Sequence, residues 1–312
     1  MEQVEERVQA AFASWHGVNH LIAFGDSYTT TGFRVNGEQP RPANPFGNPQ
    51  YPGLTTSNGP NWIDFLTTTY NDTFVKTVNF AFGGATVDQA IIPQFLPAIK
   101  SFKDQLFDFY LPHYSAAPVS FPWKASDTLF TFFFGINDVH TAILKPTPGA
   151  STAQILTTAV ARYAAFIDVV YHSGARNFLF INVPPVERAP TVTIKGAAEV
   201  HAHAEAIVQW NRDVSALTTN LTTTYPDVTT FLFDANSLFN QVMDEPCSYE
   251  ETCALEDTSA SCEQYIRNNP ATWYSKDPAC RYAVDHYFWL NMLHPTFRIH
   301  NVTAKLIAQQ LR

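Results

Sequence analysis

The feature that most constrains this fold is a regular alternation along the chain of short apolar runs and longer segments with a helical pattern. The apolar runs are rich in Phe, Val and Ile, are bounded by polar or glycine-containing turns, and span residues 20–25, 75–80, 128–134, 176–183 and 228–233. Runs this short and this apolar are typical of strands that are buried on both faces of a parallel sheet.

Segments with a helical pattern lie between these runs. They span residues 58–69, 87–110, 151–172, 198–223 and 295–311. The third begins with the capping box Ser151-Thr-Ala-Gln154 and ends before Gly174, an expected C′ glycine, while Pro295 suits the first turn of the last helix. Alternating strands and helices predict an α/β protein, a three-layer α/β/α sandwich with a parallel sheet of about five strands.

The rest of the chain predicts loops around one domain and no second domain. Residues 30–57, 112–126 and 244–284 carry many of the prolines and glycines. We therefore expect a single domain over residues 1–312, with 1–18 as an N-terminal lead-in and 244–284 as a cysteine-bearing loop insertion. Apolar residues make up 46% of the chain, which is enough to bury a large core.

Charge and missing motifs exclude several classes of function. The net charge is −9 and no run of Lys or Arg forms a phosphate-binding stripe, which argues against a nucleic-acid partner. No apolar stretch approaches about 20 residues, so we expect no membrane span. His201 and His203 are two apart in a predicted helix and cannot chelate one metal. No nucleotide or zinc motif is present, so we expect chemistry without a cofactor or a metal; the sequence gives no indication of the oligomeric state.

Four cysteines lie close together and lack a C-x-x-C spacing: Cys247, Cys253, Cys262 and Cys280. This favours two disulfides over zinc and leaves three pairings open. Glycosylation sequons begin at Asn71, Asn220 and Asn301. Together these features indicate a secreted glycoprotein. The N-terminus lacks the apolar region of a signal peptide, so we expect a mature form, with an intracellular protein as the alternative.

Polar residues that could do chemistry follow the first three runs, where ligands bind to open α/β sheets. Ser27 follows the first run, Gly83 and Gly84 follow the second, and Asn137 follows the third. A serine hydroxyl is a nucleophile once a base takes its proton, and glycine N–H and Asn amide groups can hold an oxyanion. Each also has a purely structural explanation. Ser27 could cap a helix, the two glycines could form a tight turn, and Asn137 could form an Asx turn.

His294 precedes the last predicted helix, in the segment Asn291-Met-Leu-His294-Pro295-Thr296. Neutral imidazole is the usual proton acceptor for a serine nucleophile, although a lone histidine is often structural. We expect Asp26, beside Ser27, to bind local backbone and not to act as the catalytic acid. A nucleophile, a base and two oxyanion donors in one chain indicate acyl transfer.

These segments resemble the four blocks of the GDSL, or SGNH, hydrolase superfamily, which carry Ser, Gly, Asn and His in this order. Tyr28 stands where the family name has Leu, and Gly83 is an alternative for the second block. The resemblance implies the SGNH hydrolase fold and serine-esterase chemistry. The matching residues are Ser27, Gly84, Asn137 and His294.

Further segments resemble fungal members grouped as carbohydrate esterase family sixteen. They are residues 57–62 (SNGPNW), 79–86 (NFAFGGAT) and 182–188 (NVPPVER). This resemblance implies an acetylesterase that acts on acetylated sugars or short xylo-oligosaccharides. Two alternatives stay open: a lipase-like or aryl esterase with a larger acyl pocket, and an inactive carbohydrate-binding homologue.

The sequence departs from the superfamily at Asn291, where the last block, Asp-x-x-His, has an acid. In a serine protease, replacing the corresponding Asp by Asn costs about 10⁴ in kcat. Three explanations compete. A side-chain or backbone oxygen of Asn291 accepts the His294 Nδ1–H in a Ser-His dyad, or Asp285 supplies the acid, or the enzyme is natively weak or carries an introduced substitution. We favour the first.

Overall fold

Five parallel strands form one sheet in the computed structural model, which describes residues 12, 14–267 and 270–312. The order across the sheet is β2-β1-β3-β4-β5. The strands are β1 (His20–Gly25), β2 (Lys76–Asn79), β3 (Thr128–Phe133), β4 (Asn177–Ile181) and β5 (Thr229–Phe233). Each lies within a predicted apolar run, and the α/β class with a five-stranded parallel sheet is confirmed. Most of the expected lead-in, residues 1–11 and 13, lies outside the described residues.

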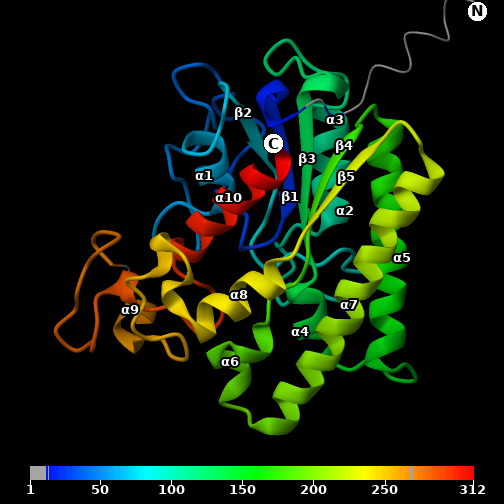
Figure 1. Ribbon diagram of the computed structural model, residues 1–312. Coiled ribbons are helices and arrows are strands. Elements are labelled where there is room, and N and C mark those ends of the chain that lie inside the picture. The colour runs from blue at the N-terminus through cyan, green and yellow to red at the C-terminus, as the bar shows by residue number, and fades with distance from the viewer. Residues whose placement is uncertain (1–11, 13, 268–269) are drawn as a thin grey trace, which may run out of the picture.

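Helices cover both faces of this sheet. Figure 1 shows α1 and α10 on one side of the strands and α5 and α7 on the other, which is the predicted three-layer arrangement. The main covering helices are α1 (Trp62–Thr68), α5 (Thr152–His172), α7 (Ala197–Thr224) and α10 (Phe297–Leu311). The others are α2 (Phe102–Asp104), α3 (Leu111–His113), α4 (Ile136–Leu144), α6 (Pro190–Thr193), α8 (Ala235–Asp244) and α9 (Glu263–Arg267).

Phenylalanine rings fill the layer between the sheet and α5. Phe24, Phe132 and Phe180 come from the adjacent strands β1, β3 and β4, and successive rings are stacked with centroids 5.3 Å apart. All three side chains are fully buried. Since burying such a side chain contributes about 1.5–3 kcal/mol, these strand residues hold the sheet in register where the site begins.

The helix α5 begins and ends as its sequence predicts. The Ser151 side chain accepts a hydrogen bond from the Gln154 N–H, and Gly174 has a φ of +111° just beyond the helix. By length and composition α5 could cross a membrane, which corrects the expectation that no segment is long and apolar enough. One face of α5 packs against the core and α7.

Other predicted helices differ from the structure. Residues 87–100 form turns, and only α2 and a π-helix over Gln105–Tyr110 lie within the predicted helix 87–110. Pro93 and Pro97 explain this, since proline cannot donate a helical hydrogen bond. The helix α1 begins late because the Asn61 side chain caps it, and α10 begins at Phe297, so Pro295 precedes that helix.

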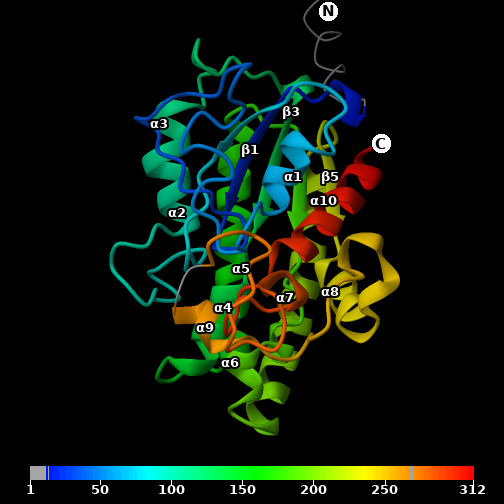
Figure 2. The same ribbon diagram turned by 90° about the vertical axis from the view of Figure 1, so that its left-hand side faces the viewer.

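The predicted cysteine-bearing segment is mostly irregular but contains α9. Its disulfides join Cys247 to Cys253 and Cys262 to Cys280, which resolves the pairing that the sequence left open. Figure 2 shows α9 in front of α4, at the end of the molecule away from the C-terminus. Sequence patterns did not predict α3, α4, α6, α8 or α9.

Candidate active site

The strand order brings two of the predicted site residues to one edge of the sheet. In the order 2-1-3-4-5 the connections reverse direction between β1 and β3, which leaves a crevice at the carboxyl ends of these strands. Gly25 and Phe133, the last residues of β1 and β3, are paired in register. Ser27 comes two positions after Gly25 and Asn137 four positions after Phe133, so both lie close to this edge of the sheet.

Ser27 lies in a tight turn that its neighbours hold in place. The Asp26 carbonyl accepts the N–H groups of Thr29 and Thr30, and the Asp26 carboxylate accepts the Tyr28 N–H at 2.9 Å. The Thr56 hydroxyl donates to the Ser27 carbonyl at 2.7 Å. Asp26 therefore binds local backbone, and the Ser27 hydroxyl is left to contact other groups.

His294 contacts the Ser27 hydroxyl although 267 positions separate them. The distance from His294 Nε2 to Ser27 Oγ is 2.8 Å. The Tyr28 hydroxyl donates to the Leu293 carbonyl at 2.6 Å, and the Leu290 N–H donates to the His294 carbonyl at 2.8 Å. The turn that carries the serine therefore also anchors the segment that carries the histidine.

The side-chain oxygen of Asn291 gathers three donors. It accepts the Leu293 N–H at 3.0 Å and the His294 N–H at 2.8 Å, and His294 Nδ1 lies 3.1 Å away. Because this amide oxygen only accepts, Nδ1 carries the proton and Nε2 presents its lone pair to Ser27. Asp285, the alternative acid, instead forms an ion pair with Arg298.

Burial sets the protonation state of the histidine. Desolvation lowers the pKa of His294 to about 4, so the ring is neutral at pH 7. The fully buried His300 has a pKa lowered to about 3, first by burial and then by the nearby charge of His294. Neutral imidazole is the form that can accept a proton from the Ser27 hydroxyl.

The backbone N–H groups of Ser27, Gly83 and Gly84 are candidate donors for an oxyanion. The N–H groups of Ser27, Gly83 and Gly84 bind no acceptor within the part of the chain that the structure describes. Gly84 has a φ of +82°, and a Cβ there would lie 2.4 Å from the Phe95 ring, so this position requires glycine. A Cβ on Gly83 would meet only the Ser27 Cβ, at 3.9 Å. Both glycines therefore remain candidates for the second-block donor.

Asn137 lies in the first turn of α4, beside the same donors. Its Nδ2 donates to the Ala85 carbonyl at 3.1 Å and more weakly to the Asp26 carboxylate at 3.3 Å. Because the bond to Asp26 is long and weak, an oxyanion can share the hydrogen that Nδ2 donates there. Gly135 precedes this turn with a φ of +121°, and a Cβ there would clash with the Trp210 ring, so glycine is required.

Two buried carboxyl groups support the site, and sequence reasoning missed one of them. Asp138, which follows Asn137 in the chain, accepts the Val87 N–H at 3.0 Å and so holds the chain that follows Gly84. Burial raises the pKa of both Asp26 and Asp138 to about 7, and for Asp26 this value includes a smaller contribution from the nearby Asp138 carboxylate. The sequence signal that could have identified Asp138 is its place directly after Asn137, in an Asn-Asp pair whose second residue positions the surrounding backbone.

No group of three or more His, Cys, Asp or Glu side chains in residues 12, 14–267 and 270–312 could hold a metal ion. The side chain of His203 is buried against His140, whereas that of His201 is exposed and pairs with Glu205. These two histidines point to different sides of α7, as expected. Catalysis without a cofactor stays a prediction.

Two pockets lie on either side of residues 53–55, next to Thr56, which donates to the Ser27 carbonyl. The first, which we call the phenylalanine pocket, has a volume of about 520 Å³; its apolar lining includes Phe33, Leu54, Phe80, Phe82 and Phe109, with Gly83 at its edge. The second, the Trp273 pocket, has a volume of about 480 Å³ and is lined by residues that include Gly53, Thr55, Asn58, Gly59, Thr272, Trp273 and Tyr274.

Comparison with known proteins agrees with this geometry. A profile of the family described as GDSL-like lipase/acylhydrolase matches residues 21–307. An acetylesterase from the fungus Thermothelomyces thermophilus is 33% identical over 291 residues, which cover 93% of this chain and 87% of that protein. The thermolabile hemolysin of Vibrio parahaemolyticus is 25% identical over 293 residues, covering 92% of this chain and 62% of that protein.

A solved structure shares the fold at low sequence identity. The acetylxylan esterase Axe2 from Geobacillus stearothermophilus superposes with a TM-score of 0.51 and 15% identity, covering 97% of this chain and 96% of that chain. At this identity the likeness supports the fold alone. The family matches confirm the resemblance that the four sequence blocks indicated.

Proposed function

This chain belongs to the GDSL-like lipase/acylhydrolase family and is a carboxylic ester hydrolase, and we propose that Ser27 is its nucleophile and His294 its general base. The observation that carries the proposal is the 2.8 Å contact between Ser27 Oγ and His294 Nε2. With a His294 pKa of about 4, the ring is ready to accept the serine proton at neutral pH.

The reaction runs through an acyl-enzyme. Ser27 Oγ attacks the ester carbonyl carbon while its proton moves to His294 Nε2, which gives a tetrahedral intermediate. His294 then protonates the departing alcohol oxygen, and the C–O bond to the alcohol breaks. A water molecule, deprotonated by His294, attacks the acyl-enzyme, and collapse of the second intermediate releases the carboxylic acid and returns the proton to Ser27.

The oxyanion of each intermediate is held by three donors. We assign the backbone N–H groups of Ser27 and Gly84 and the Nδ2 of Asn137 to this role, with Gly83 as the alternative glycine. Asn291 acts through its side-chain oxygen, which keeps the proton of His294 on Nδ1. We propose a Ser-His dyad, in which no carboxylate stabilises the imidazolium.

The proposed substrate is an acetylated sugar or short xylo-oligosaccharide. The acetylesterase relative, aligned over 93% of this chain, supports this choice over a lipid ester. All parts of the site come from one sheet and its loops, so we propose a single catalytic domain.

The deciding experiment measures acetate release from acetylated xylo-oligosaccharides and from a long-chain lipid ester, with Ser27→Ala as the inactive control. We expect acetate release that depends on Ser27, together with labelling of Ser27 by a fluorophosphonate probe. Faster turnover of the lipid ester would favour the lipase-like alternative. Oligosaccharide binding without labelling or hydrolysis would identify the carbohydrate-binding homologue.

The two disulfides and the fungal relative are compatible with an extracellular protein. We propose secretion, with glycosylation at one or more of the three sequons; Asn220, on α7, is exposed, and Asn71 and Asn301 are partly exposed. Endoglycosidase treatment of the protein from a secreting host, followed by peptide mapping, should locate sugar at one or more of these asparagines.

A further inference from the structure

One short segment separates the two pockets beside the site. Leu54 lines the phenylalanine pocket, whereas its neighbours Gly53 and Thr55 line the Trp273 pocket. The next residue, Thr56, is bound to the nucleophile through its hydroxyl, which donates to the Ser27 carbonyl at 2.7 Å. The segment 53–56 that separates the pockets is therefore anchored to the Ser27 backbone, so an ester bound at Ser27 has a pocket on either side of this segment.

The Trp273 pocket lies against Phe297, the first residue of the helix that follows the histidine segment. The Trp273 and Tyr274 rings lie 5.8 Å and 5.7 Å from the Phe297 ring, and Phe297 is three positions beyond His294. Gly59, at the opposite wall, packs against Phe297 so closely that an added Cβ would lie 3.0 Å from it. We therefore place an alcohol bound in this pocket on the side of Ser27 that carries the histidine segment.

The phenylalanine pocket instead adjoins the oxyanion donors. Gly83 lines it and lies against Ser27, where an added Cβ would be 3.9 Å from the Ser27 Cβ. Its lining comes from the segments after β1 and β2, from Leu54 and from the π-helix. A group in this pocket is therefore on the Gly83 side of Ser27, beside the oxyanion donors.

The mechanism assigns a direction to each part of the ester. His294 has to protonate the alcohol oxygen as it leaves, so the alcohol lies on the histidine side. The acyl chain is the other substituent of the same carbonyl carbon, and it extends to the opposite side.

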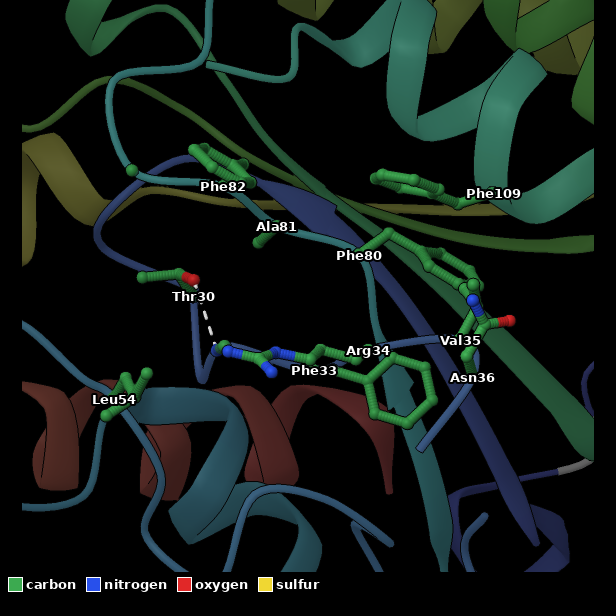
Figure 3. A pocket seen from close by; sticks show the side chains of 12 residues that line it. Thr30, Phe33, Arg34, Val35, Asn36, Leu54, Phe80, Ala81, Phe82 and Phe109 are labelled. Carbon is green, nitrogen blue, oxygen red and sulfur yellow. Dashed lines mark hydrogen bonds between the residues drawn. The ribbon is translucent and has the colours of Figure 1, made fainter. Parts of the chain in front are cut away.

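The chemistry of the two pockets agrees with this assignment. Figure 3 shows Phe82 and Phe109 across the phenylalanine pocket from Phe33. Phe82 and Leu54 are 39% and 66% exposed, and apolar side chains left open beside a site typically bind an apolar group. The Trp273 pocket pairs aromatic faces with the hydroxyl and amide groups of Thr55 and Asn58, a combination that suits a sugar ring.

We propose that the phenylalanine pocket takes the acyl chain of the ester and that the Trp273 pocket takes the alcohol. This assignment rests on the proposed serine-esterase mechanism and extends it, because a pocket of about 520 Å³ accepts acyl chains well beyond acetyl. The enzyme is thus selective for a sugar alcohol and tolerant of apolar acyl groups such as butyryl and hexanoyl.

The acyl half is tested with p-nitrophenyl acetate, butyrate and hexanoate, which share one alcohol. We expect wild type to hydrolyse the hexanoate, and Phe82→Ala to lower the hexanoate-to-acetate ratio of kcat/KM about tenfold, the loss typical of apolar contacts in a specificity pocket. Phe74→Ala is the matched control. Phe74 is 44% exposed but precedes β2, at the other end of the sheet. The hexanoate-to-acetate ratio of the Phe74→Ala variant should therefore equal that of wild type.

The alcohol half is tested with one acyl group and two alcohols, acetylated xylo-oligosaccharide and ethyl acetate. Tyr274, 60% exposed, can be truncated without opening the core. We expect Tyr274→Ala to lower the ratio of kcat/KM for the oligosaccharide over ethyl acetate about tenfold and to leave the hexanoate-to-acetate ratio at the wild-type value. Phe82→Ala should show the reverse pattern.

Three results would overturn the assignment. The first is a wild type that cleaves acetate but not butyrate or hexanoate. The second is a Phe82→Ala variant with a wild-type acyl ratio or with an altered alcohol ratio. The third is a Tyr274→Ala variant that changes acyl and not alcohol selection. Absence of any Ser27-dependent hydrolysis, in contrast, would refute the proposed function itself.

Discussion

The two halves of the site are held in place by different means. Ser27 and Asn137 follow β1 and β3, which are paired in register up to Gly25 and Phe133. His294 lies in an irregular segment before α10, and no strand or helix contains it. We call these the strand-end half and the histidine half.

Single hydrogen bonds position the histidine half. The Tyr28 hydroxyl, the Asn291 side chain and the Thr191 N–H, which donates to the Met292 carbonyl at 2.8 Å, hold it against the sheet. A sheet edge cannot shift by the loss of one side chain, whereas a loop held by three or four such bonds can. Loss of one bond that positions His294 should therefore give a graded fall in activity, whereas loss of Ser27, His294 or Asn137 removes a group that takes part in the reaction.

The largest effect tests whether the two halves work as one unit. We expect Ser27→Ala and His294→Ala each to lower kcat about 10⁴- to 10⁶-fold, and the double variant to lower it no further, because each residue needs the other for proton transfer. The measurement is kcat on p-nitrophenyl acetate, with circular dichroism to check folding. A double variant far less active than either single variant would show that the halves contribute independently.

The next effect lies within the strand-end half. Asn137→Ala should lower kcat about 10²- to 10³-fold with little change in KM, because an oxyanion donor acts mainly in the transition state. Thr141→Ala, one turn further along α4, is the control and should retain wild-type kcat. An Asn137→Ala enzyme with full activity and an unchanged melting temperature would remove Asn137 from the site.

This division also explains what the sequence could predict. Ser27, Gly84 and Asn137 each come directly after a buried apolar run, so the rule that parallel strands place their carboxyl ends together was enough to group them. No such rule applied to Asn291 and His294. His294 was chosen as a candidate base from its residue type and its place before the last helix, and Asn291 entered only through the resemblance. The route of their segment depends on contacts such as that with Tyr28, 265 positions away, which no local pattern encodes.

Local patterns failed where irregular chain wraps the site. Residues 87–100 have helical periodicity, but prolines and the packing of Phe95 on Gly84 impose turns. The Trp273 pocket forms where residues 270–274 meet residues 52–59, a long-range contact. In our proposal this pocket helps to select the substrate, so the sequence predicted the chemistry more completely than the specificity.

A smaller effect concerns the bond between the halves. Tyr28→Phe removes the hydroxyl that holds the Leu293 carbonyl at 2.6 Å, and we expect kcat to fall about tenfold as His294 loses its alignment, with KM unchanged. Tyr70→Phe is the control, since it removes a similar hydroxyl that donates to Asn301 at 2.7 Å, away from the site. Both variants should lose similar stability. Equal kcat values in the two would show that Tyr28 supports only the fold.

The smallest effect on kcat, and the sharpest test of the histidine half, comes from Asn291→Asp. A carboxylate 3.1 Å from Nδ1 favours imidazolium, so the pKa of His294 should rise from about 4. Because the base must be neutral, wild-type kcat/KM should fall only as the pH drops through about 4. The variant should lose activity at a higher pH.

At pH 8 the histidine is neutral in both enzymes, and kcat should differ by less than tenfold because the Asn291 oxygen already fixes the tautomer. Asn291→Ala, which removes the acceptor of three hydrogen bonds, is the control and should be less active than either. A hundredfold gain in Asn291→Asp at pH 8 would mean that the histidine half lacks a necessary acid, and the dyad interpretation would then be wrong.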